Sequence, residues 1–148
     1  MRSACIALLA LALCQTASAE PNRLVKTECD GGVCRRVTVG SAWEYKVVDL
    51  TNAIRRRHGL RPLKVTEKAM NFARGWSGTQ ARVGKMFHSR EPGWAENVIV
   101  GYGSPEAQVD AWFNSPGHRR NMLNPNHSEI GVGVVMNGRT PYGTQVFR

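Results

Sequence analysis

The fold class of this chain is decided by the stretch Glu129-Ile130-Gly131-Val132-Gly133-Val134-Val135-Met136-Asn137-Gly138. Large apolar residues recur there at every second position, and such alternation is typical of a β-strand. The closing Asn-Gly pair is a strong signal for a tight hairpin turn. Residues 144–147 at the end of the chain are the expected partner strand, and residues 97–100 a further strand.

Four helices are predicted upstream of this strand pair. The first begins with a capping box at Ser41–Glu44 and ends at Gly59. Thr66 caps the second, Ser104-Pro105-Glu106 opens the third, and Ser115-Pro116 opens a short fourth. Apolar residues at helical spacing, expected to face a core, are Val47, Leu50, Ile54, Ala69, Phe72, Ala73, Trp76, Val109, Trp112 and Phe113. Helices that precede a strand pair indicate mixed layers of helix and sheet.

Residues 1–19 are predicted to be a secretory signal peptide that is cleaved before Glu20. A basic start, an apolar run over residues 6–13 and the small residues Ala17-Ser18-Ala19 fit this pattern. A membrane anchor is the alternative, but the apolar run is shorter than the roughly 18 residues needed to span a bilayer. We therefore expect a secreted or periplasmic protein with no transmembrane segment after cleavage.

Cys29 and Cys34 are the two cysteines that remain after cleavage of the signal. An oxidising compartment favours their pairing in a disulfide. Asp30-Gly31-Gly32 between them is a turn sequence with extended flanks, so residues 20–40 are expected to form a hairpin extension before a compact domain over residues 41–148. A redox pair or a metal site is the alternative, although a zinc ribbon would need a second pair of cysteines.

The formal net charge of +9 favours anionic partners, such as a membrane surface, a cell-wall polymer or a nucleic acid. A merely solvated basic surface is the simpler alternative. We expect Arg55-Arg56-Arg57 on the outer face of a helix, and no aromatic residues interleave with this run in a way that indicates base stacking. Nucleic acid is therefore not the expected partner, whereas a peripheral anionic surface stays open.

His88, Glu96 and His118 are the candidate functional residues, and each lies in a short distinctive context. Two imidazoles and a carboxylate suit a divalent metal ion, or proton transfer near neutral pH. Asn97, Arg119 and Asn121 are expected to brace these side chains by hydrogen bonds. His58 and His127 show no partner pattern and are interpreted as surface residues.

The order of motifs along the chain is more specific than any single motif. These motifs are Asn52-x-x-Arg55, Gly59-Leu60-x-Pro62-Leu63, Phe87-His88-Ser89, Ala95-Glu96-Asn97-Val98, residues 112–123 (WFNSPGHRRNML), Glu129–Gly133 and Thr144–Phe147. Over residues 44–148 the chain resembles the CAP superfamily of cysteine-rich secretory, antigen 5 and pathogenesis-related proteins. It is most similar to the short bacterial SCP-like members.

The resemblance implies an α+β fold, a three-layer α-β-α sandwich with a short, mostly antiparallel sheet between helices. It also implies a cleft lined by two histidines and two glutamates, in which the histidines can hold zinc or another divalent cation. His88, Glu96 and His118 match three of these four positions, with Asn97 and Ser115 in the same cleft. The second glutamate falls at Asn114 or Ser115, so a mechanism with paired carboxylates is in doubt.

Two main functions follow from the resemblance, and whether the protein is an enzyme stays open. The first is an extracytoplasmic binding module that takes a lipid, an envelope component or a protein in its cleft. The second is a metal-assisted, peptidase-like hydrolase in which His88 and His118 hold the ion and Glu96 is the catalytic base. A secreted nuclease is a third hypothesis, based on Gly117-His118-Arg119 followed by Asn121, and it fits the motif order less well.

Overall fold

A computed structural model describes residues 23–30 and 33–148, with side chains described from Ser41 onward. The predicted signal peptide lies outside these residues. An antiparallel hairpin of β1 (Arg23–Asp30) and β2 (Val33–Ser41) places the backbones of Cys29 and Cys34 opposite each other. The thiols of that pair also lie outside the described side chains, so the disulfide stays a prediction.

The main sheet has the strand order β3-β5-β6-β4. Its strands are β3 (Lys64–Val65), β4 (Ala95–Val100), β5 (Glu129–Asn137) and β6 (Thr140–Phe147). The predicted hairpin is β5 and β6, and β4 pairs antiparallel with the outer side of β6. Only the short β3 runs parallel to its neighbour. The sheet is therefore mixed but mostly antiparallel, as expected.

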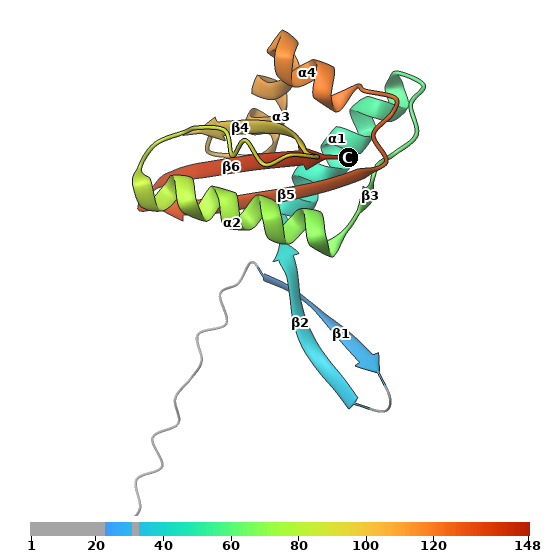
Figure 1. The fold of residues 1–148 in the computed structure, drawn as a ribbon, viewed down its shortest axis with the longest axis vertical. Coiled ribbons are helices and arrows are strands. Elements are labelled where there is room, and N and C mark those ends of the chain that lie inside the picture. The colour runs from blue at the N-terminus through green and yellow to red at the C-terminus, as the bar shows by residue number, and fades with distance from the viewer. Residues whose placement is uncertain (1–22, 31–32) are drawn as a thin grey trace, which may run out of the picture.

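Helices cover both faces of this sheet, which confirms the three-layer α+β architecture (Figure 1). The front face carries α2 (Glu67–Val83) along β5 and β6. Behind the sheet lie α1 (Ala42–Arg57) and α3 (Pro105–Asn114), and α4 (Pro116–Met122) lies above β4. The capping box at Ser41 is present, because Glu44 and Ser41 exchange hydrogen bonds between side chain and backbone.

The core between α1, α3 and the sheet is formed by fully buried apolar side chains. Its members include Val47, Trp112, Met122, Ile130, Val132 and Phe147. The indole of Trp112 also donates a hydrogen bond to the carbonyl of Val98, 3.3 Å away, so α3 is held at a fixed position on β4. Burying such aromatic side chains is among the largest single contributions to a small core.

On the other face, the glycines of β5 let α2 approach the sheet backbone to backbone. A Cβ atom on Gly131 would lie 2.1 Å from the carbonyl carbon of Ala69, and one on Gly133 would lie 2.3 Å from that of Ala73. The small residues of α2 and the glycines of β5 are therefore complementary. The glycines that alternate with apolar residues in the predicted strand are therefore the positions at which α2 packs against β5.

Side chains of the two long helices complete the edge of β5, because β3 pairs with only two of its residues. The N–H of Val132 points to the sulfur of Met70, 3.2 Å away, and the N–H of Val134 donates to Oε1 of Glu44 at 3.2 Å. Glu44 is also paired with Arg74, at 3.1 Å. One buried carboxylate therefore joins α1, α2 and β5.

Two expectations about surface residues are wrong. Arg56 and Arg57 are exposed, but Arg55 is only 1% exposed. Its guanidinium donates to the carbonyls of Met122 and Asn124, which end α4, and so ties α1 to that helix. His127 is partly buried and stacks on Phe147 with ring centroids 5.7 Å apart.

Candidate functional site

The start of β4 supports the candidate site, because Glu96 and Asn97 are consecutive there and face opposite sides of the strand. The segment between α2 and β4 brings His88 to Glu96, and α4 carries His118 in its first turn. Three stretches that are distant in sequence therefore meet at one edge of the sheet.

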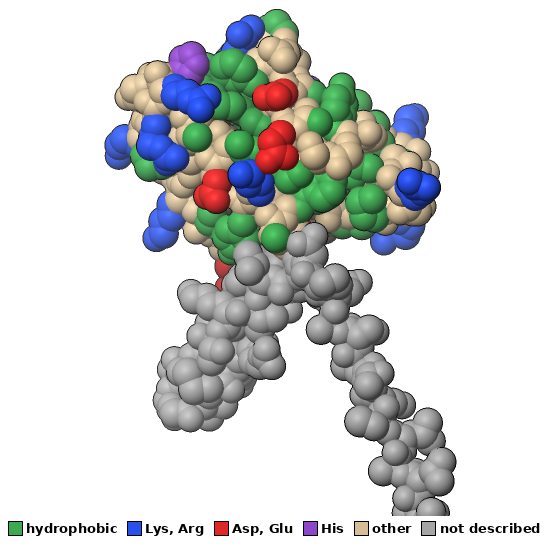
Figure 2. Space-filling model, turned by 180° about the vertical axis from the view of Figure 1, so that it is seen from behind, with side chains coloured by type: hydrophobic (Ala, Val, Ile, Leu, Met, Phe, Trp, Pro, Cys, Tyr) green, Lys and Arg blue, Asp and Glu red, His purple; other side chains and the backbone are tan. Residues whose placement is uncertain are grey.

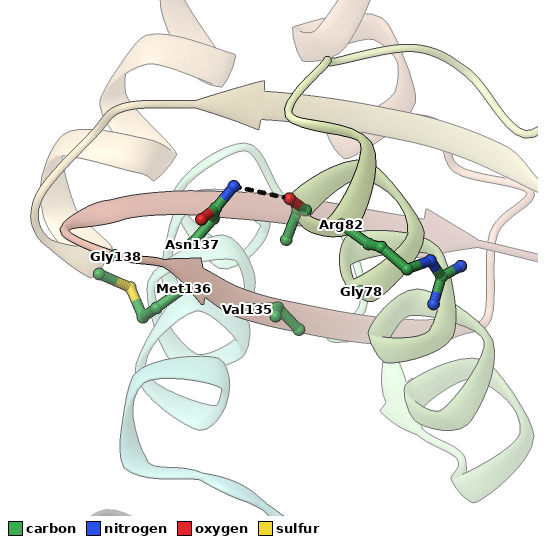
Figure 3. A pocket seen from close by; sticks show the side chains of 7 residues that line it. Gly78, Arg82, Val135, Met136, Asn137 and Gly138 are labelled. Carbon is green, nitrogen blue, oxygen red and sulfur yellow. Dashed lines mark hydrogen bonds between the residues drawn. The ribbon is translucent and has the colours of Figure 1, made fainter.

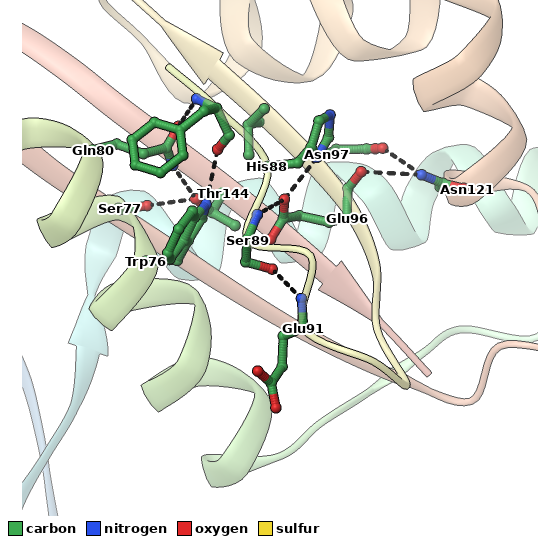
Figure 4. A network of polar contacts seen from close by, with 12 residues as sticks. Trp76, Ser77, Gln80, His88, Ser89, Glu91, Glu96, Asn97, Asn121 and Thr144 are labelled. Atoms are coloured by element: carbon green, nitrogen blue, oxygen red, sulfur yellow. Dashed lines mark hydrogen bonds and ion pairs between the residues drawn. The ribbon is translucent and has the colours of Figure 1, made fainter. Parts of the chain in front are cut away.

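His88 and Glu96 form the central contact of the site (Figure 4). Nδ1 of His88 lies 2.7 Å from Oε1 of Glu96, and the backbone N–H of Ser89 donates to the same oxygen at 3.0 Å. The side chain of Glu96 is only 7% exposed, whereas that of His88 is 56% exposed. If Nδ1 of His88 donates to Oε1 of Glu96, the lone pair of the neutral ring is on Nε2.

The second carboxylate oxygen of Glu96 has a different environment. Oε2 is buried and has no hydrogen-bond partner among the described residues. Burial of an oxygen without a partner costs free energy. The contacts of Oε1 with His88 and Ser89 therefore hold the carboxylate in place. This geometry is that of a group which orients a histidine.

His118 is partly buried, and two effects lower its pKa. Burial is the larger cause because it disfavours the charged imidazolium, and the positive charge of protonated His88 is the second. The charge of His88 therefore acts on His118 across the site. The lowered pKa also keeps His118 neutral, which is the form that binds metal ions.

Buried amides fix the position of α4 over β4. Asn97 donates from Nδ2 to the carbonyl of His118, and Asn121 of α4 donates to Oδ1 of Asn97 at 2.9 Å. Asn97 also donates to Gln145, whose own amide donates to Thr51 of α1 at 2.8 Å. Polar groups buried this deeply specify one arrangement when they are satisfied.

A second network, which the sequence reasoning missed, holds the segment before His88. Trp76 donates from its indole to the carbonyl of Phe87 at 2.9 Å, and Gln80 accepts from the N–H of Phe87 at 3.2 Å (Figure 4). Gln80 donates in turn to Thr144 of β6. The available signal was the helical spacing of Trp76 and Gln80, which puts a polar residue within an apolar stripe.

Three further residues named in the sequence analysis lie on α3 and α4 or between them. Ser115 joins α3 to α4, and its side chain makes no capping hydrogen bond to α4. The guanidinium of Arg119 stacks over Phe113 at 5.4 Å, and Asn114 is exposed. Among the described residues, no group of three or more His, Cys, Asp and Glu side chains could hold a metal ion.

If a cation binds here, its candidate protein ligands are the imidazoles of His88 and His118. Glu96 uses Oε1 for His88 and Ser89, which is the arrangement by which a carboxylate orients a histidine that could bind a metal ion. Two protein nitrogens are fewer than the three protein ligands of most catalytic zinc sites. An ion held by them would keep its other positions for water or an incoming ligand. No helix within residues 33–148 is long and apolar enough to cross a membrane.

Comparisons with known proteins bear on the same region. The sequence profile of the cysteine-rich secretory protein (CAP) family matches residues 48–147. YkwD of Bacillus subtilis is 38% identical over 139 residues, which are 83% of this chain and 53% of YkwD. The membrane protein YlbC of the same organism is 32% identical over 107 residues, which are 62% of this chain and 31% of YlbC. The chain thus spans about half or less of these relatives.

Solved structures show the same fold. An extracellular protein of Bacillus anthracis with an SCP domain has a TM-score of 0.62 and 28% identity, over 70% of this chain and 39% of that one. A cysteine-rich secretory protein of Staphylococcus aureus has a TM-score of 0.56 and 23% identity, over 76% of this chain and 41% of that one. The second likeness shows the fold alone.

Proposed function

This chain belongs to the cysteine-rich secretory protein (CAP) family, and we propose that it is an exported binding module whose cleft holds a divalent ion between His88 and His118. The observation that carries the proposal is the 2.7 Å contact between Nδ1 of His88 and Oε1 of Glu96. A carboxylate behind an imidazole is the common support of a metal ligand, because it fixes the tautomer and the ring orientation. Neutral imidazole is a common ligand of zinc, and also of copper, iron and nickel, so zinc is the first ion to test.

Each residue of the site has one task in this proposal. Glu96 holds the proton on Nδ1 of His88. Asn97 fixes the position of His118 by donating a hydrogen bond to the backbone carbonyl of His118. When bound, the ion supplies a Lewis-acidic centre that attracts an anionic or carbonyl group of the ligand. With two protein nitrogens we expect modest affinity and open positions for that ligand, which is a lipid, an envelope component or a protein.

A metal-assisted hydrolase is the alternative, and it has less support. The base in that mechanism would be Glu96, yet its Oε1 already accepts two hydrogen bonds and its side chain is 7% exposed. The family's second glutamate is replaced by Asn114 or Ser115. We therefore propose that Glu96 is a positioning residue.

Export belongs to the same proposal. A signal peptide over residues 1–19 agrees with the extracellular relative in Bacillus anthracis and with an outer surface protein of Borrelia burgdorferi that has the same fold. We propose that the mature chain begins at Glu20 and that Cys29 and Cys34 form a disulfide. Intact mass of the exported protein, with and without reductant, tests both statements.

A zinc titration tests the metal site. The mature protein should bind zinc, and His88→Ala and His118→Ala should each weaken binding at least about tenfold, since each removes one of two nitrogens. His58→Ala is the matched control, because His58 is an exposed histidine outside the cleft. Equal affinity in the wild type and both cleft variants would remove the metal site from the proposal.

A ligand screen separates the two functions. Purified protein is incubated with lipid, peptide and DNA panels, with and without a chelator. Saturable uptake without turnover supports the binding module. Turnover that the chelator abolishes and that Glu96→Gln loses would instead establish the hydrolase.

A further inference from the structure

The large apolar side chains that are exposed in the described part of the chain gather at one end of the sheet. They are Val83, Met86, Tyr102 and Met136, at 59%, 45%, 43% and 49% exposure. Val83 ends α2, and Asn137 next to Met136 donates to the carbonyl of Ala81 at 2.8 Å, so the β5–β6 turn lies against the end of α2.

Tyr102 belongs to the same end because of the register of β4. Val100 pairs with Tyr142, near the β5–β6 turn, and Gly101 donates to the carbonyl of Pro141 at 2.9 Å. The turn that carries Tyr102 therefore lies at the same end of the sheet as the β5–β6 turn. We call this surface of Val83, Met86, Tyr102 and Met136 the apolar end.

Exposed cations surround the apolar end. Arg82 and Lys85 flank the end of α2, and Arg139 lies in the β5–β6 turn. The acid in the first turn of the adjoining α3, Glu106, is paired with Lys46 at 3.8 Å. Figure 2 shows blue side chains at both extremities of the globular part, with acidic ones between them.

A hollow of about 350 Å³ lies beside this end, between α2 and the β5–β6 turn (Figure 3). Its lining includes Gly78, Val135 and Met136, with Arg82 at the side of α2. An added Cβ on Gly78 would meet nothing within 4 Å, so the absence of a side chain keeps the hollow open. The lining is mixed, with the apolar Ala81, Val135 and Met136 beside the polar Arg82 and Asn137, and such a hollow suits a polar headgroup rather than an acyl chain.

The opposite end of the molecule provides an internal comparison. Arg56, Arg57 and Arg120 are exposed there, near the end of α1 and on α4, which are joined through Arg55. None of the exposed large apolar side chains of the described residues belongs to these elements. Positive charge alone is thus a general feature of the surface, whereas charge combined with apolar exposure marks one end.

We propose that the apolar end docks on an anionic phospholipid bilayer. Met86, Tyr102 and Met136 enter the interface, and the cations meet the headgroups, because each basic residue near an anionic leaflet contributes about 1 kcal/mol. This inference is independent of the proposed metal site. The contact of His88 with Glu96 lies toward the other end of β4, where Glu96 pairs with Val146. His88 follows Met86 by only two residues, however, so the cleft would lie beside the docked surface.

Vesicle co-sedimentation of the mature protein tests the proposal, with phosphatidylcholine vesicles and with vesicles that also contain phosphatidylglycerol. The wild type should bind only the anionic vesicles. The triple variant Arg82→Gln, Lys85→Gln, Arg139→Gln should lose about fivefold per charge. The matched triple Arg56→Gln, Arg57→Gln, Arg120→Gln removes equal charge at the opposite end and should bind nearly as the wild type does.

A second variant separates docking from simple adsorption. Met86→Ser with Met136→Ser keeps every charge and should weaken binding at least about threefold, because the apolar side chains no longer enter the interface. Unchanged binding of this variant, or equal loss in both charge triples, would overturn the proposal. So would wild-type protein that does not bind the anionic vesicles. His88→Ala should retain vesicle binding, which distinguishes this surface from the metal site.

Discussion

Asn97 of β4 donates a hydrogen bond from Nδ2 to the backbone carbonyl of His118 across 3.2 Å. Asn97 is fully buried. Its Oδ1 also accepts a hydrogen bond from Asn121, and its Nδ2 also donates to Gln145. The position of an imidazole at the surface is therefore set by an amide inside the protein. Support of this kind is what keeps a site rigid when its own residues are partly exposed.

Asn97→Ala should destabilise the protein by about 1–3 kcal/mol, because Asn121 and Gln145 lose a buried partner. It should also weaken zinc binding, since α4 is no longer tied to β4. Urea unfolding and zinc titration measure the two effects. Asn114→Ala, which removes an exposed amide, is the control and should change neither quantity. Normal zinc affinity in Asn97→Ala would show that α4 needs no such support.

Glu96→Gln should lower zinc affinity about 10–100-fold and leave the fold intact, because the amide is nearly isosteric and holds the His88 tautomer less firmly. Zinc titration and far-UV circular dichroism check the two parts. Glu91→Gln is the control, since Glu91 is an exposed carboxylate in the same segment. An affinity loss of the same size in both variants would point to general electrostatics.

The local elements could be predicted from the sequence because their signals are local. The capping box at Ser41, the caps at Thr66 and Ser104, and the alternation over residues 129–137 all correspond to observed elements. Each depends on residues within one or two turns of helix, or on a strand period of two. The start of β6 was missed by four residues, since Thr140–Gly143 alternate weakly.

Partners across the fold could not be predicted from such signals. Arg55 belongs to a basic run, and only the carbonyls at the end of α4 explain its burial. The same holds for the edge of β5, where Met70 and Glu44 replace a neighbouring strand. For the site, the motif order indicated which residues meet, but the roles of Gln80 and Trp76 depend on how the segment before His88 packs.

Gly131→Ala should be strongly destabilising, by about 3 kcal/mol or more, because the new Cβ would lie 2.1 Å from the backbone of Ala69. Helix α2 would have to shift along its whole contact with β5. Gly78→Ala is the control within α2, where an added Cβ meets nothing within 4 Å, and it should stabilise by up to about 1 kcal/mol. Thermal and urea unfolding measure both changes in stability. A Gly131→Ala variant as stable as the wild type would contradict close packing between α2 and β5.

Glu44→Ala should cost about 2–3 kcal/mol, because the N–H of Val134 loses its buried acceptor and Arg74 loses one of its contacts. The capping box of α1 is lost in the same variant. Glu106→Ala is the control, since its pair with Lys46 is exposed on both sides and exposed pairs contribute little. Similar unfolding free energies for the two variants would contradict the joining role of Glu44.

The titration of His118 is the most direct test of whether the two imidazoles are neighbours. Burial and the charge of His88 lower the pKa of His118 in the folded protein, so the folded state resists its protonation. The unfolded state then binds more protons as pH falls below about 6.5, and stability is lost in that direction. His118→Asn should flatten this part of the curve of unfolding free energy against pH.

His88→Ala removes one of the two causes and leaves burial in place. The pKa of His118 in the metal-free protein should therefore rise part of the way toward its usual value, which NMR titration of the ring protons measures. His58→Ala should leave it unchanged, because no effect of His58 contributes to the lowered pKa. If the pKa of His118 does not change in His88→Ala, the two rings are not neighbours. The proposed pair of metal ligands would then lose its geometric basis.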